Sequence, residues 1–595
     1  MVIIMRIKIV FYFISLISLI LLGRIFFLSI KSNAYFEELS VQNYTKRIYN
    51  PSIRGVIKDR NGVALAVNQL GFSLYLKPHL VVKKNDDKLQ YLAKFIQQNF
   101  PDFDSSKIIK KYKSEDSHYN HDSIEVVEYI KYEDFIPKYP IFNSKSDIEI
   151  KTSYKREYPF KDVGAHIIGY VGKATQKEID NNEMAKHTKN VGKSGLEKFY
   201  NNFLQGGLGY TDMKVNAHNE EVEVLDVVNP NIYNDLQISI DIRLQQLLHE
   251  LFKGKSGAAV VMNIESGEIL AAGSFPEIDN NLFANGISPQ DWNSIINDPN
   301  RPFTNKLTNG LYPPGSVIKM GVALSFLENG LPPDFSVYCN GGIQLGNRKF
   351  RCWKGTGHGS TDIVKAIRES CDVFFYEGSL KIGVGKVSKT LDDLGIGRAT
   401  GIDLPNEFLG INPSQEWKEK KYKKPWFIGE TVVSSIGQGY FLATPLQIAK
   451  YTGAIVSERI VTPHFRIDAN LTKNQKNRSI NKTFYALIKE GMYQVCNEKG
   501  GTATSSIKSK VKLLGKTGTA QVVGISQSEK NRASEDAMDY YHRSHAWFTS
   551  AAPAQNPKYV VTVLLEHGGH GGTVSAPIAS RMFDKLLELG YITQP

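Results

Sequence analysis

The sequence predicts an α/β (α+β) protein in three parts: a single N-terminal transmembrane helix, an extended mixed α/β pedestal domain, and a C-terminal domain with an antiparallel sheet flanked by helices. Two observations lead to this prediction. One long apolar run stands near the N-terminus, and no second run of this kind follows it. Apolar strand patterns occur at both ends of residues 236–595 with helical patterns between them, which indicates a sheet assembled from both ends of a domain.

The N-terminal apolar run covers Ile9–Ile30 and contains a single charge, Arg24. A helix of this length spans about 30 Å, which matches the hydrocarbon core of a bilayer. Two basic residues precede the run, so we expect residues 1–8 to form a cytoplasmic tail and the rest of the chain to lie on the outer side. A cleaved signal peptide is the alternative, but the segment after the run offers only a poor cleavage site.

Residues 31–235 have the pattern of a mixed α/β domain with charged loops. An Asn61-Gly62 pair lies between apolar runs, which is a strong local signal for a β-hairpin. Residues 86–147 are rich in Lys, Asp, Tyr and Asn, as in a small solvated subdomain. Because a turn-rich linker follows at residues 229–234, we place the end of this pedestal domain at residue 235.

The composition restricts the class of function. Lys and Arg total 72 against 60 Asp and Glu, so the net charge is +12, which suits an anionic partner. The sequence has no zinc-finger pair, no aromatic RNA-binding signature and no basic low-complexity arm, so we expect no nucleic acid partner. Four Cys in 595 residues exclude a fold built on a framework of disulfides.

The C-terminal domain, residues 236–595, has a predicted hairpin near its start and three predicted strands near its end. The hairpin joins residues 258–264 to 269–272 through a Glu-Ser-Gly-Glu turn. The polar stretch at residues 524–544 is expected to be a mobile loop between two of the later strands. These three strands cover residues 513–523, 546–551 and 559–565.

The first candidate catalytic element begins at Ser316, which follows a Pro-Pro-Gly turn. On a helix that starts there, Ser316 and Lys319 are three residues apart and share a face. A serine hydroxyl is a poor nucleophile until a base takes its proton, and a desolvated lysine can be that base. The helix N-terminus also offers free N–H groups where an oxyanion would develop. Alone, the same pair also fits a helix N-cap followed by a surface lysine.

Two further short patterns carry candidate catalytic residues. Ser370 and Asp372 flank a cysteine just before an apolar run, an arrangement that alone also fits a helix N-cap. The segment Lys516-Thr517-Gly518-Thr519 lies in a strand pattern, where alternation directs the lysine and the glycine to one side and the threonines to the other. The missing side chain of the glycine leaves room for a substrate backbone beside the strand.

Together and in this order, Ser-x-x-Lys, Ser-x-Asp and Lys-Thr-Gly-Thr resemble the three signatures of penicillin-recognising serine acyltransferases. The middle motif normally ends in Asn, and Asp372 resembles the variant found in the penicillin-binding protein 2 family, the elongation-specific class B penicillin-binding proteins. Further matches to this family extend along nearly the whole chain: Arg54-Gly55, Asp59-Arg60-Asn61-Gly62, Gly195-Leu196-Glu197, Phe350-Arg351-Cys352-Trp353, Gly357-His358-Gly359, Gly437-Gln438-Gly439, Thr444-Pro445-Leu446-Gln447 and His545-Ala546-Trp547-Phe548.

The resemblance implies a serine-type peptidoglycan D,D-transpeptidase that crosslinks stem peptides during cell-wall elongation and is a target of β-lactams. Ser316 would attack the penultimate D-Ala carbonyl of a stem peptide and release the terminal D-Ala, with Lys319 as the base. Ser370 would relay a proton to the leaving group, and Lys516 would tune that network. An amine of a neighbouring stem would then attack the acyl-enzyme. The acyl transfer would need no cofactor.

The resemblance also implies a substrate-binding role for Thr517, Gly518 and Thr519, with the two threonine hydroxyls holding the substrate carboxylate. The backbone N–H groups of Ser316 and Thr519 would form the oxyanion hole. The role of Asp372 stays open, because a carboxylate cannot donate a hydrogen bond unless it is protonated.

Three of the four cysteines lie near a histidine, with the spacing Cys339-x12-Cys352-x5-His358-x12-Cys371. Cys thiolates and His imidazole are zinc ligands, and three cysteines with one histidine make a closed structural set. A Cys339–Cys352 disulfide is the alternative in an oxidising compartment, and buried free thiols are another. The resemblance favours structural zinc, because the elongation-specific branch carries a zinc site at these positions. Cys496 is expected to be a buried small apolar residue.

The resemblance further implies partners and a location. The substrates would be peptidoglycan stem peptides on lipid-linked precursor strands, and the domain at residues 236–595 would lie in the periplasm, anchored to the inner membrane by residues 9–30. A SEDS-family glycosyltransferase would supply the polymerisation of glycan strands. Other membrane proteins of the elongation complex would be further partners. A penicillin sensor or scaffold, and a carboxypeptidase or β-lactamase, are the alternatives; the anchor and the pedestal disfavour a compact hydrolase.

Overall fold

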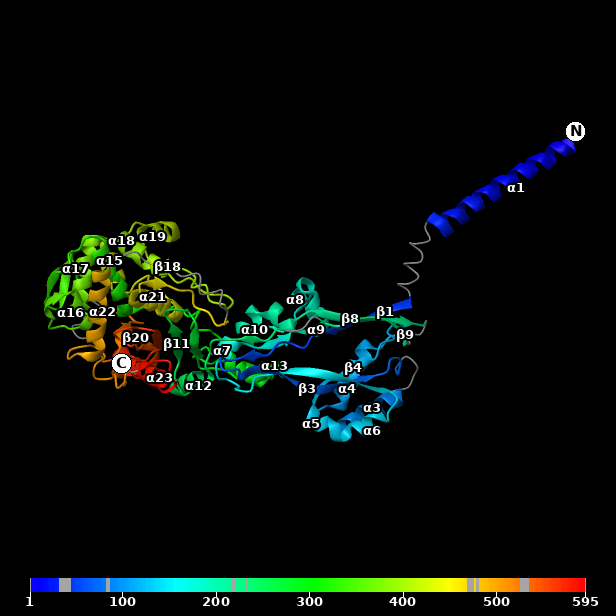
Figure 1. Cartoon of the computed structure of the whole chain (residues 1–595), viewed down its shortest axis with the longest axis horizontal. Coiled ribbons are helices and arrows are strands. Elements are labelled where there is room, and N and C mark those ends of the chain that lie inside the picture. The colour runs from blue at the N-terminus through cyan, green and yellow to red at the C-terminus, as the bar shows by residue number, and fades with distance from the viewer. Residues whose placement is uncertain are drawn as a thin grey trace.

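The computed structural model describes residues 2–31, 44–81, 86–216, 221–230, 234–467, 476–477, 481–524 and 534–593. The molecule is elongated: helix α1 (Val2–Phe26), the pedestal and the C-terminal domain follow one another along its long axis (Figure 1). Residues 525–533 of the expected mobile loop lie outside the described residues.

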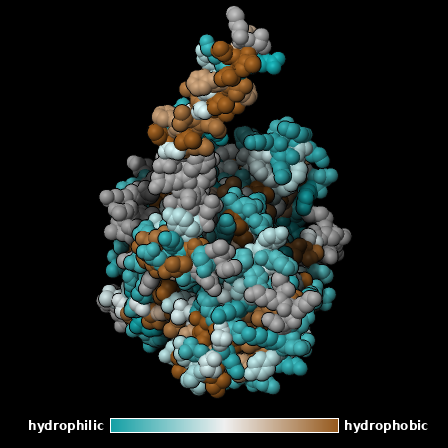
Figure 2. Space-filling model, turned by 90° about the vertical axis from the view of Figure 1, so that its right-hand side faces the viewer, coloured by the Kyte–Doolittle hydropathy of each residue, from teal (hydrophilic) through white to brown (hydrophobic). Residues whose placement is uncertain are grey.

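Helix α1 continues into a π-helical turn at Phe27–Lys31. By length and composition the segment Ile3–Lys31 can cross a membrane, with a hydropathy of 2.4 and no burial against the protein. Figure 2 shows its apolar surface standing away from the body of the molecule. The helix starts earlier than the predicted residue 9, because residues 2–8 contain neither Gly nor Pro and are mostly apolar. The expected N-terminal tail is therefore helical from residue 2.

Within the described residues, the pedestal contains two larger sheets and a two-stranded antiparallel pair, β6 (Val171–Lys173) with β7 (Asn190–Gly192). The Asn61-Gly62 turn joins β2 (Ile57–Lys58) to β3 (Ala64–Leu76), as predicted. The buried Asp59 carboxylate holds the turn, because it accepts the N–H groups of Asn61 and Val63 at 2.8 Å each. One sheet has the strand order β1-β8-β9 and the other β10-β2-β3-β4, with β5 also paired to β3. The strands are β1 (Thr45–Pro51), β2 (Ile57–Lys58), β3 (Ala64–Leu76), β4 (Ile124–Lys131), β5 (Ile148–Glu157), β6 (Val171–Lys173), β7 (Asn190–Gly192), β8 (Leu208–Val215), β9 (Glu221–Val228) and β10 (Leu236–Gln237).

The predicted subdomain at residues 86–147 has a small core of its own. Helix α3 buries Leu89, Leu92 and Ile96 on one face, the spacing expected of an amphipathic helix. The pedestal helices are α3 (Asp86–Asn99), α4 (Ser105–Glu115), α5 (Tyr132–Phe135), η2 (Ile136–Lys138), α6 (Tyr139–Asn143), α7 (Ala165–Ile168), α8 (Gln176–Asn181), α9 (Glu183–Thr188), α10 (Gly195–Phe199) and α11 (Asn201–Gln205).

A buried ion cluster gives a structural role to two of the motifs that match the family, Arg54-Gly55 and Gly195-Leu196-Glu197. The Glu197 carboxylate, fully buried, pairs with Arg54 at 2.6 Å and with Arg156 at 2.7 Å. The two guanidinium groups lower the pKa of Glu197 against the opposing effect of burial. A buried carboxylate is tolerated only with such partners, so these residues tie together segments far apart in the pedestal sequence.

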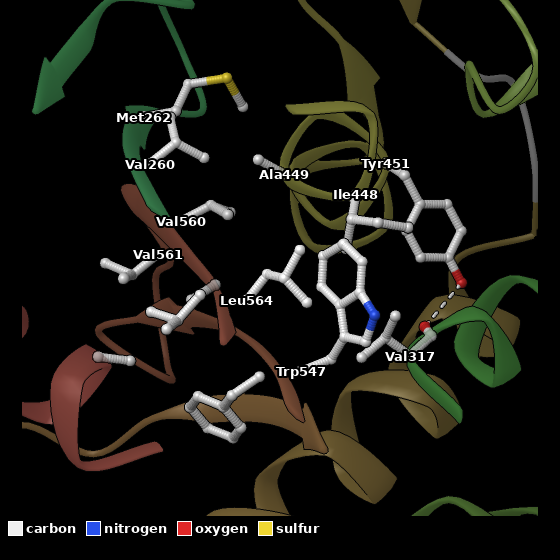
Figure 3. Close-up of a cluster of buried hydrophobic side chains, with 14 of the residues drawn as sticks. Val260, Met262, Val317, Ile448, Ala449, Tyr451, Trp547, Val560, Val561 and Leu564 are labelled. Atoms are coloured by element: carbon white, nitrogen blue, oxygen red, sulfur yellow. Dashed lines mark hydrogen bonds between the residues drawn. The ribbon is translucent and has the colours of Figure 1, made fainter. Parts of the chain in front are cut away.

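The C-terminal domain is built on a five-stranded antiparallel sheet with the order β12-β11-β21-β20-β19, which confirms a sheet assembled from both ends of the domain. Its strands are β11 (Gly257–Asn263), β12 (Ile269–Phe275), β19 (Leu514–Ala520), β20 (His545–Ala552) and β21 (Tyr559–Leu565). Strands β11 and β21 are buried along almost their whole length, because helices contact both sides of the sheet. Helices α12 (Ile242–Leu251) and α23 (Gly571–Glu588) contact one side, and α21 (Pro445–Ser457) contacts the other. Figure 3 shows part of this core, with Ala449 of α21 on the side of Val560 and Ile448 on the side of Trp547.

The helices of this domain surround the sheet and form a second, mainly helical region on the side of β19 (Figure 1). They are α12 (Ile242–Leu251), α13 (Asn280–Ala284), α14 (Pro289–Ile296), η3 (Gly315–Ile318), α15 (Lys319–Glu328), α16 (Ile363–Arg368), α17 (Asp372–Ile382), α18 (Val384–Asp393), α19 (Gln415–Tyr422), α20 (Ile428–Ser434), α21 (Pro445–Ser457), α22 (Lys482–Asn497), η5 (Glu535–Ala537), η6 (Tyr540–His542) and α23 (Gly571–Glu588). Short strands complete it: β13 (Ser336–Cys339), β14 (Gly342–Leu345), β15 (Arg348–Arg351), β16 (Gly359–Asp362), β17 (Arg459–Ile460) and β18 (Lys476–Asn477).

Helix α21 starts at the Thr444-Pro445-Leu446-Gln447 motif, which forms a capping box. The Thr444 hydroxyl accepts the N–H of Gln447 at 3.2 Å, and the Gln447 side-chain oxygen accepts the N–H of Thr444 at 3.1 Å. Proline at the first helical position has no N–H to leave unsatisfied. The motif thereby fixes the start of a helix that supports the candidate site.

Candidate active site and metal-binding cluster

Ser316 lies in the 3-10 turn η3, directly before helix α15, and Lys319 is the first residue of that helix. Side chains three residues apart lie above one another in a 3-10 turn, so the two residues share a face, as predicted. The half-buried Ser316 hydroxyl makes no hydrogen bond within the part of the chain that the structure describes. It is therefore available to a substrate.

The turn that carries Ser316 is held from several sides. Trp547 on β20 donates its indole N–H to the carbonyl of Pro313 at 3.0 Å. The Tyr451 hydroxyl of α21 lies 2.8 Å from the Ile318 carbonyl and 3.4 Å from that of Val317 (Figure 3). Gly437 is required opposite the turn, because a Cβ there would lie 2.3 Å from the Gly315 carbonyl oxygen.

Lys319 is fully buried, and its amine is surrounded by acceptors from the second motif. Its Nζ lies 2.6 Å from Oδ1 of Asp372, 3.0 Å from the Ser370 carbonyl oxygen and 3.3 Å from the Ser370 hydroxyl. The second oxygen of Asp372 accepts the backbone N–H of Trp353 at 2.8 Å. The carboxylate that replaces the usual amide is thus an acceptor on both oxygens.

Ser370 joins the two lysines. Its hydroxyl lies 3.0 Å from Nζ of Lys516 and 3.3 Å from Nζ of Lys319. Its backbone is left-handed, with φ +54°, a conformation that costs a residue other than glycine about 1–2 kcal/mol. The three motifs therefore meet at one buried serine.

Burial sets the charge balance of this centre. It lowers the pKa of Lys516 well below its ordinary value, and the nearby Lys319 ammonium acts in the same direction. Burial also raises the pKa of Asp372, which the charge of Lys319 opposes. The arrangement favours a neutral Lys516 beside a Lys319–Asp372 ion pair.

The third motif lies on β19, an edge strand of the sheet, so within the described residues one side of its backbone has no strand partner and can pair with an extended substrate. The Thr517 hydroxyl lies 2.7 Å from that of Thr502. Gly518 faces the turn that carries Ser316, because a Cβ there would lie 3.0 Å from Val317 and 3.1 Å from the Pro314 carbonyl oxygen. The glycine therefore allows β19 to approach the turn closely.

The cluster of Cys339, Cys352, His358 and Cys371 exists as the sequence predicts. All four residues are buried, and their candidate ligand atoms lie within 4.8 Å of one another. The two sulfur atoms of Cys339 and Cys352 each lie 3.5 Å from Nδ1 of His358. The residues come from the β13 end, the loop after β15, the loop before β16 and the start of α17, so separate short elements meet here.

All four cysteines of the chain are free thiols in the structure, so the Cys339–Cys352 disulfide is not formed there. Hydrogen bonds from Cys371 and His358 hold the pKa of the Cys352 thiol well below its ordinary value. A thiolate inside a buried group of four donors is the ligand chemistry that zinc prefers. Cys496 lies apart and is buried, as expected of a small apolar residue.

Two residues of this region had no role assigned from the sequence, Tyr451 and Thr502. Tyr451 lies inside an apolar helix, and nothing in its local pattern indicates a contact with a turn more than a hundred residues earlier. Thr502 follows a Gly-Gly turn, which gives no functional signal either. Both contacts arise from the tertiary structure alone.

Comparison with known families covers both domains. The model of the penicillin-binding protein transpeptidase domain matches residues 257–584. The model of the penicillin-binding protein dimerisation domain matches residues 49–238. The chain belongs to the penicillin-binding proteins. These matches place a dimerisation domain before a transpeptidase domain, as predicted, whereas the exact boundaries at 8/9, 30/31 and 235/236 stay predictions.

Two relatives of this penicillin-binding protein are described as peptidoglycan D,D-transpeptidase MrdA. The protein of Haemophilus influenzae is 33% identical and aligns over 98% of this chain and 91% of its own length. The protein of Escherichia coli K12 is 32% identical over 96% of this chain and 92% of its own length.

Solved structures agree with these relatives. Penicillin-binding protein 2 of Helicobacter pylori, solved in a complex with MreC, is 43% identical, with a TM-score of 0.85 over 92% of this chain and 99% of that chain. Penicillin-binding protein 2 of Pseudomonas aeruginosa is 28% identical, with a TM-score of 0.68 over 91% of this chain and 97% of that chain. The resemblance to the penicillin-binding protein 2 family and the serine-type transpeptidase class are confirmed.

Proposed function

We propose that this protein is a membrane-anchored peptidoglycan D,D-transpeptidase that crosslinks stem peptides during cell-wall elongation. The observation that carries the proposal is the convergence of all three motifs: Lys319 and Lys516 both contact the Ser370 hydroxyl, and Lys319 follows Ser316 by three residues at the start of α15. The family to which the chain belongs supports the enzyme class.

In the proposed acylation, Oγ of Ser316 attacks the penultimate D-Ala carbonyl, and its proton passes to the amine of Lys319. Lys319 must first lose a proton, and the Ser370 hydroxyl offers a route to Lys516, because it lies 3.3 Å from one amine and 3.0 Å from the other. Burial lowers the pKa of Lys516, so before the reaction Lys516 is the neutral one of the two lysines and has a free lone pair for this proton. As the C–N bond breaks, the proton is returned through Ser370 to the nitrogen of the leaving D-Ala.

The oxyanion is assigned to the backbone N–H groups of Ser316 and Thr519. The close approach of the two segments supports this role, because a Cβ on Gly315 would lie 2.9 Å from the carbonyl oxygen of Thr519. We assign the substrate carboxylate to the hydroxyls of Thr517 and Thr519, with the peptide lying along β19 beside Gly518. In deacylation an acceptor amine attacks the ester, a new amide bond forms, and Ser316 regains its proton.

The alternatives are separated by one set of assays on the detergent-solubilised full chain. We expect release of D-Ala together with crosslinked products when the chain acts on nascent glycan strands made by a glycosyltransferase partner. Release of D-Ala without crosslinks would instead identify a carboxypeptidase, and rapid turnover of a chromogenic β-lactam would identify a β-lactamase. Covalent penicillin labelling with neither activity would identify a sensor.

We propose structural zinc at the cluster of Cys339, Cys352, His358 and Cys371. The residues fit this ion, because tetrahedral zinc takes sulfur at about 2.3 Å and nitrogen at about 2.0 Å, so four donors within 4.8 Å need only small shifts. When bound, zinc would tie together the loops around β13, β15 and β16 with the start of α17. The acyl transfer itself needs no cofactor in this proposal.

We propose that α1 anchors the protein to the inner membrane with the N-terminus in the cytoplasm and the catalytic domain in the periplasm. The two basic residues before the predicted span support this orientation. We also propose a SEDS-family glycosyltransferase and further membrane proteins of the elongation complex as partners. The complex of the Helicobacter pylori relative with MreC supports partners of this kind.

A further inference from the structure

Trp353 contacts the second motif through both its backbone and its side chain. Its backbone N–H donates to Oδ2 of Asp372 at 2.8 Å. Its indole N–H lies 3.1 Å from the carbonyl oxygens of both Ser370 and Glu369. We infer that Trp353 is a positioning residue that holds Ser370 and Asp372 in the geometry required by Lys319; the inference rests on the proposed roles of these residues.

The Ser370 carbonyl shows why such a residue is needed. The left-handed backbone at Ser370 is unfavourable for a residue with a side chain, so it persists only when neighbouring contacts hold it. The carbonyl oxygen accepts Nζ of Lys319 at 3.0 Å and the indole N–H of Trp353 at 3.1 Å. The indole thus helps to fix the oxygen that orients the catalytic amine.

Asp372 gives the second reason. One carboxylate oxygen pairs with Lys319, and the other would be buried without a donor if the Trp353 backbone were displaced. An unpaired oxygen on a buried carboxylate is costly, so the position of the Trp353 backbone stabilises the ion pair. This contact also shows how the chain accommodates a carboxylate where penicillin-recognising acyltransferases in general have an amide.

The Trp353 side chain is 60% exposed, so its contribution to the hydrophobic core is small. Its other ring contact is with His358, at 5.5 Å between ring centroids. Removal of the indole N–H in Trp353→Phe keeps an aromatic ring at the site and is compatible with folding. The variant therefore separates the hydrogen bond from the general effects of losing a large side chain.

The test uses the detergent-solubilised full chain and a fluorescent penicillin, with rapid mixing to separate the dissociation constant of the initial complex from the acylation rate constant. We expect Trp353→Phe to lower the acylation rate constant about five- to tenfold, as loss of one hydrogen bond predicts, with the dissociation constant changed by less than about twofold. The final labelling stoichiometry, the zinc content and the thermal midpoint should match those of the unmodified protein.

The matched control is Trp292→Phe, which changes a 43% exposed indole on α14 and should leave the acylation rate constant unaltered. The inference would be overturned if Trp353→Phe had the same acylation rate constant as the unmodified protein. A loss of zinc or of thermal stability in parallel with the rate would also overturn it, because that pattern indicates a general structural role. Failure of the proposed function looks different: the unmodified chain itself would take up no penicillin, or Ser316→Ala would still be labelled.

Discussion

The amine of Lys319 lies 2.6 Å from Oδ1 of Asp372, so the second motif supplies the counter-ion for the buried lysine of the first. Both side chains are largely excluded from water, at 0% and 10% exposure. A buried ammonium without its partner is strongly unfavourable, because the interior cannot replace its hydration. The pair therefore contributes to folding as well as to the chemistry of the site.

We expect Asp372→Ala to lower the free energy of unfolding by about 3–5 kcal/mol, because it leaves the Lys319 ammonium buried and unpaired. Asp372→Asn keeps the shape and one acceptor oxygen, so its loss should be clearly smaller. Urea unfolding followed by tryptophan fluorescence measures both. An alanine variant as stable as the unmodified protein would show that the pair does not stabilise the fold.

Ser316→Ala should abolish covalent labelling by fluorescent penicillin while leaving the thermal midpoint unchanged, because the hydroxyl makes no hydrogen bond within the described residues. Lys319→Ala should also fail to label, because it removes the base next to Ser316. Ser325→Ala, further along α15, is the control and should label normally. Detection of a β-lactam adduct on Ser316→Ala by intact-mass spectrometry would refute the assignment of the nucleophile.

The purified chain should carry about one zinc per molecule at the Cys/His cluster, measured by elemental analysis, and a chelator should lower its thermal midpoint. His358→Ala should remove most of the metal, because His358 contacts two of the three sulfur atoms. Loss of metal should also slow acylation, because Cys371 lies between Ser370 and Asp372. Cys496→Ser is the control and should keep the metal.

A disulfide at Cys339 and Cys352 would give a different pattern. The protein would then respond to a reductant, ignore the chelator and contain no zinc. That result would replace the metal proposal and leave the transpeptidase function untouched.

The pair of Glu277 and His249, where the pedestal meets the C-terminal domain, should make stability depend on pH. Burial raises the pKa of Glu277 to about 7, and the 2.7 Å hydrogen bond to Glu277 raises the pKa of His249, which also lies 3.8 Å from Asp162. Between pH 4.5 and about 7 the folded Glu277 retains a proton that the unfolded chain has lost, so stability falls as the pH rises. The contribution of His249 is complete below its unfolded pKa of 6.5 and is lost as pH rises through its higher folded pKa.

Both groups therefore predict lower stability at pH 8 than at pH 5.5, by about 1–3 kcal/mol in the free energy of unfolding. Glu277→Gln should flatten this dependence, and Glu419→Gln, an exposed residue on α19, should not. Thermal midpoints across this pH range measure the effect. Identical slopes in the unmodified protein and Glu277→Gln would contradict the assignment.

Several features of this protein could be predicted from local patterns in the chain alone. The apolar run predicted α1, the Asn61-Gly62 pair predicted a turn, and the hairpin and late strands predicted the central sheet, because these signals depend on residues close together in the chain. The order of the three motifs was enough to predict the enzyme class, which the family confirms. The helix itself begins at Val2, and the boundary at 8/9 between the tail and the membrane-crossing part stays a prediction.

The way in which these elements meet could not be predicted from the sequence. The contact between the Ser370 hydroxyl and both lysines joins three segments that are distant in sequence, and no local pattern specifies its geometry. The same is true of the Tyr451 contact with the turn that carries Ser316 and of the two hydrogen bonds from Trp353 to the second motif. The physical reason is that hydrogen bonds and ion pairs between distant segments depend on where packing of the core places each backbone, which periodicity along the chain does not encode.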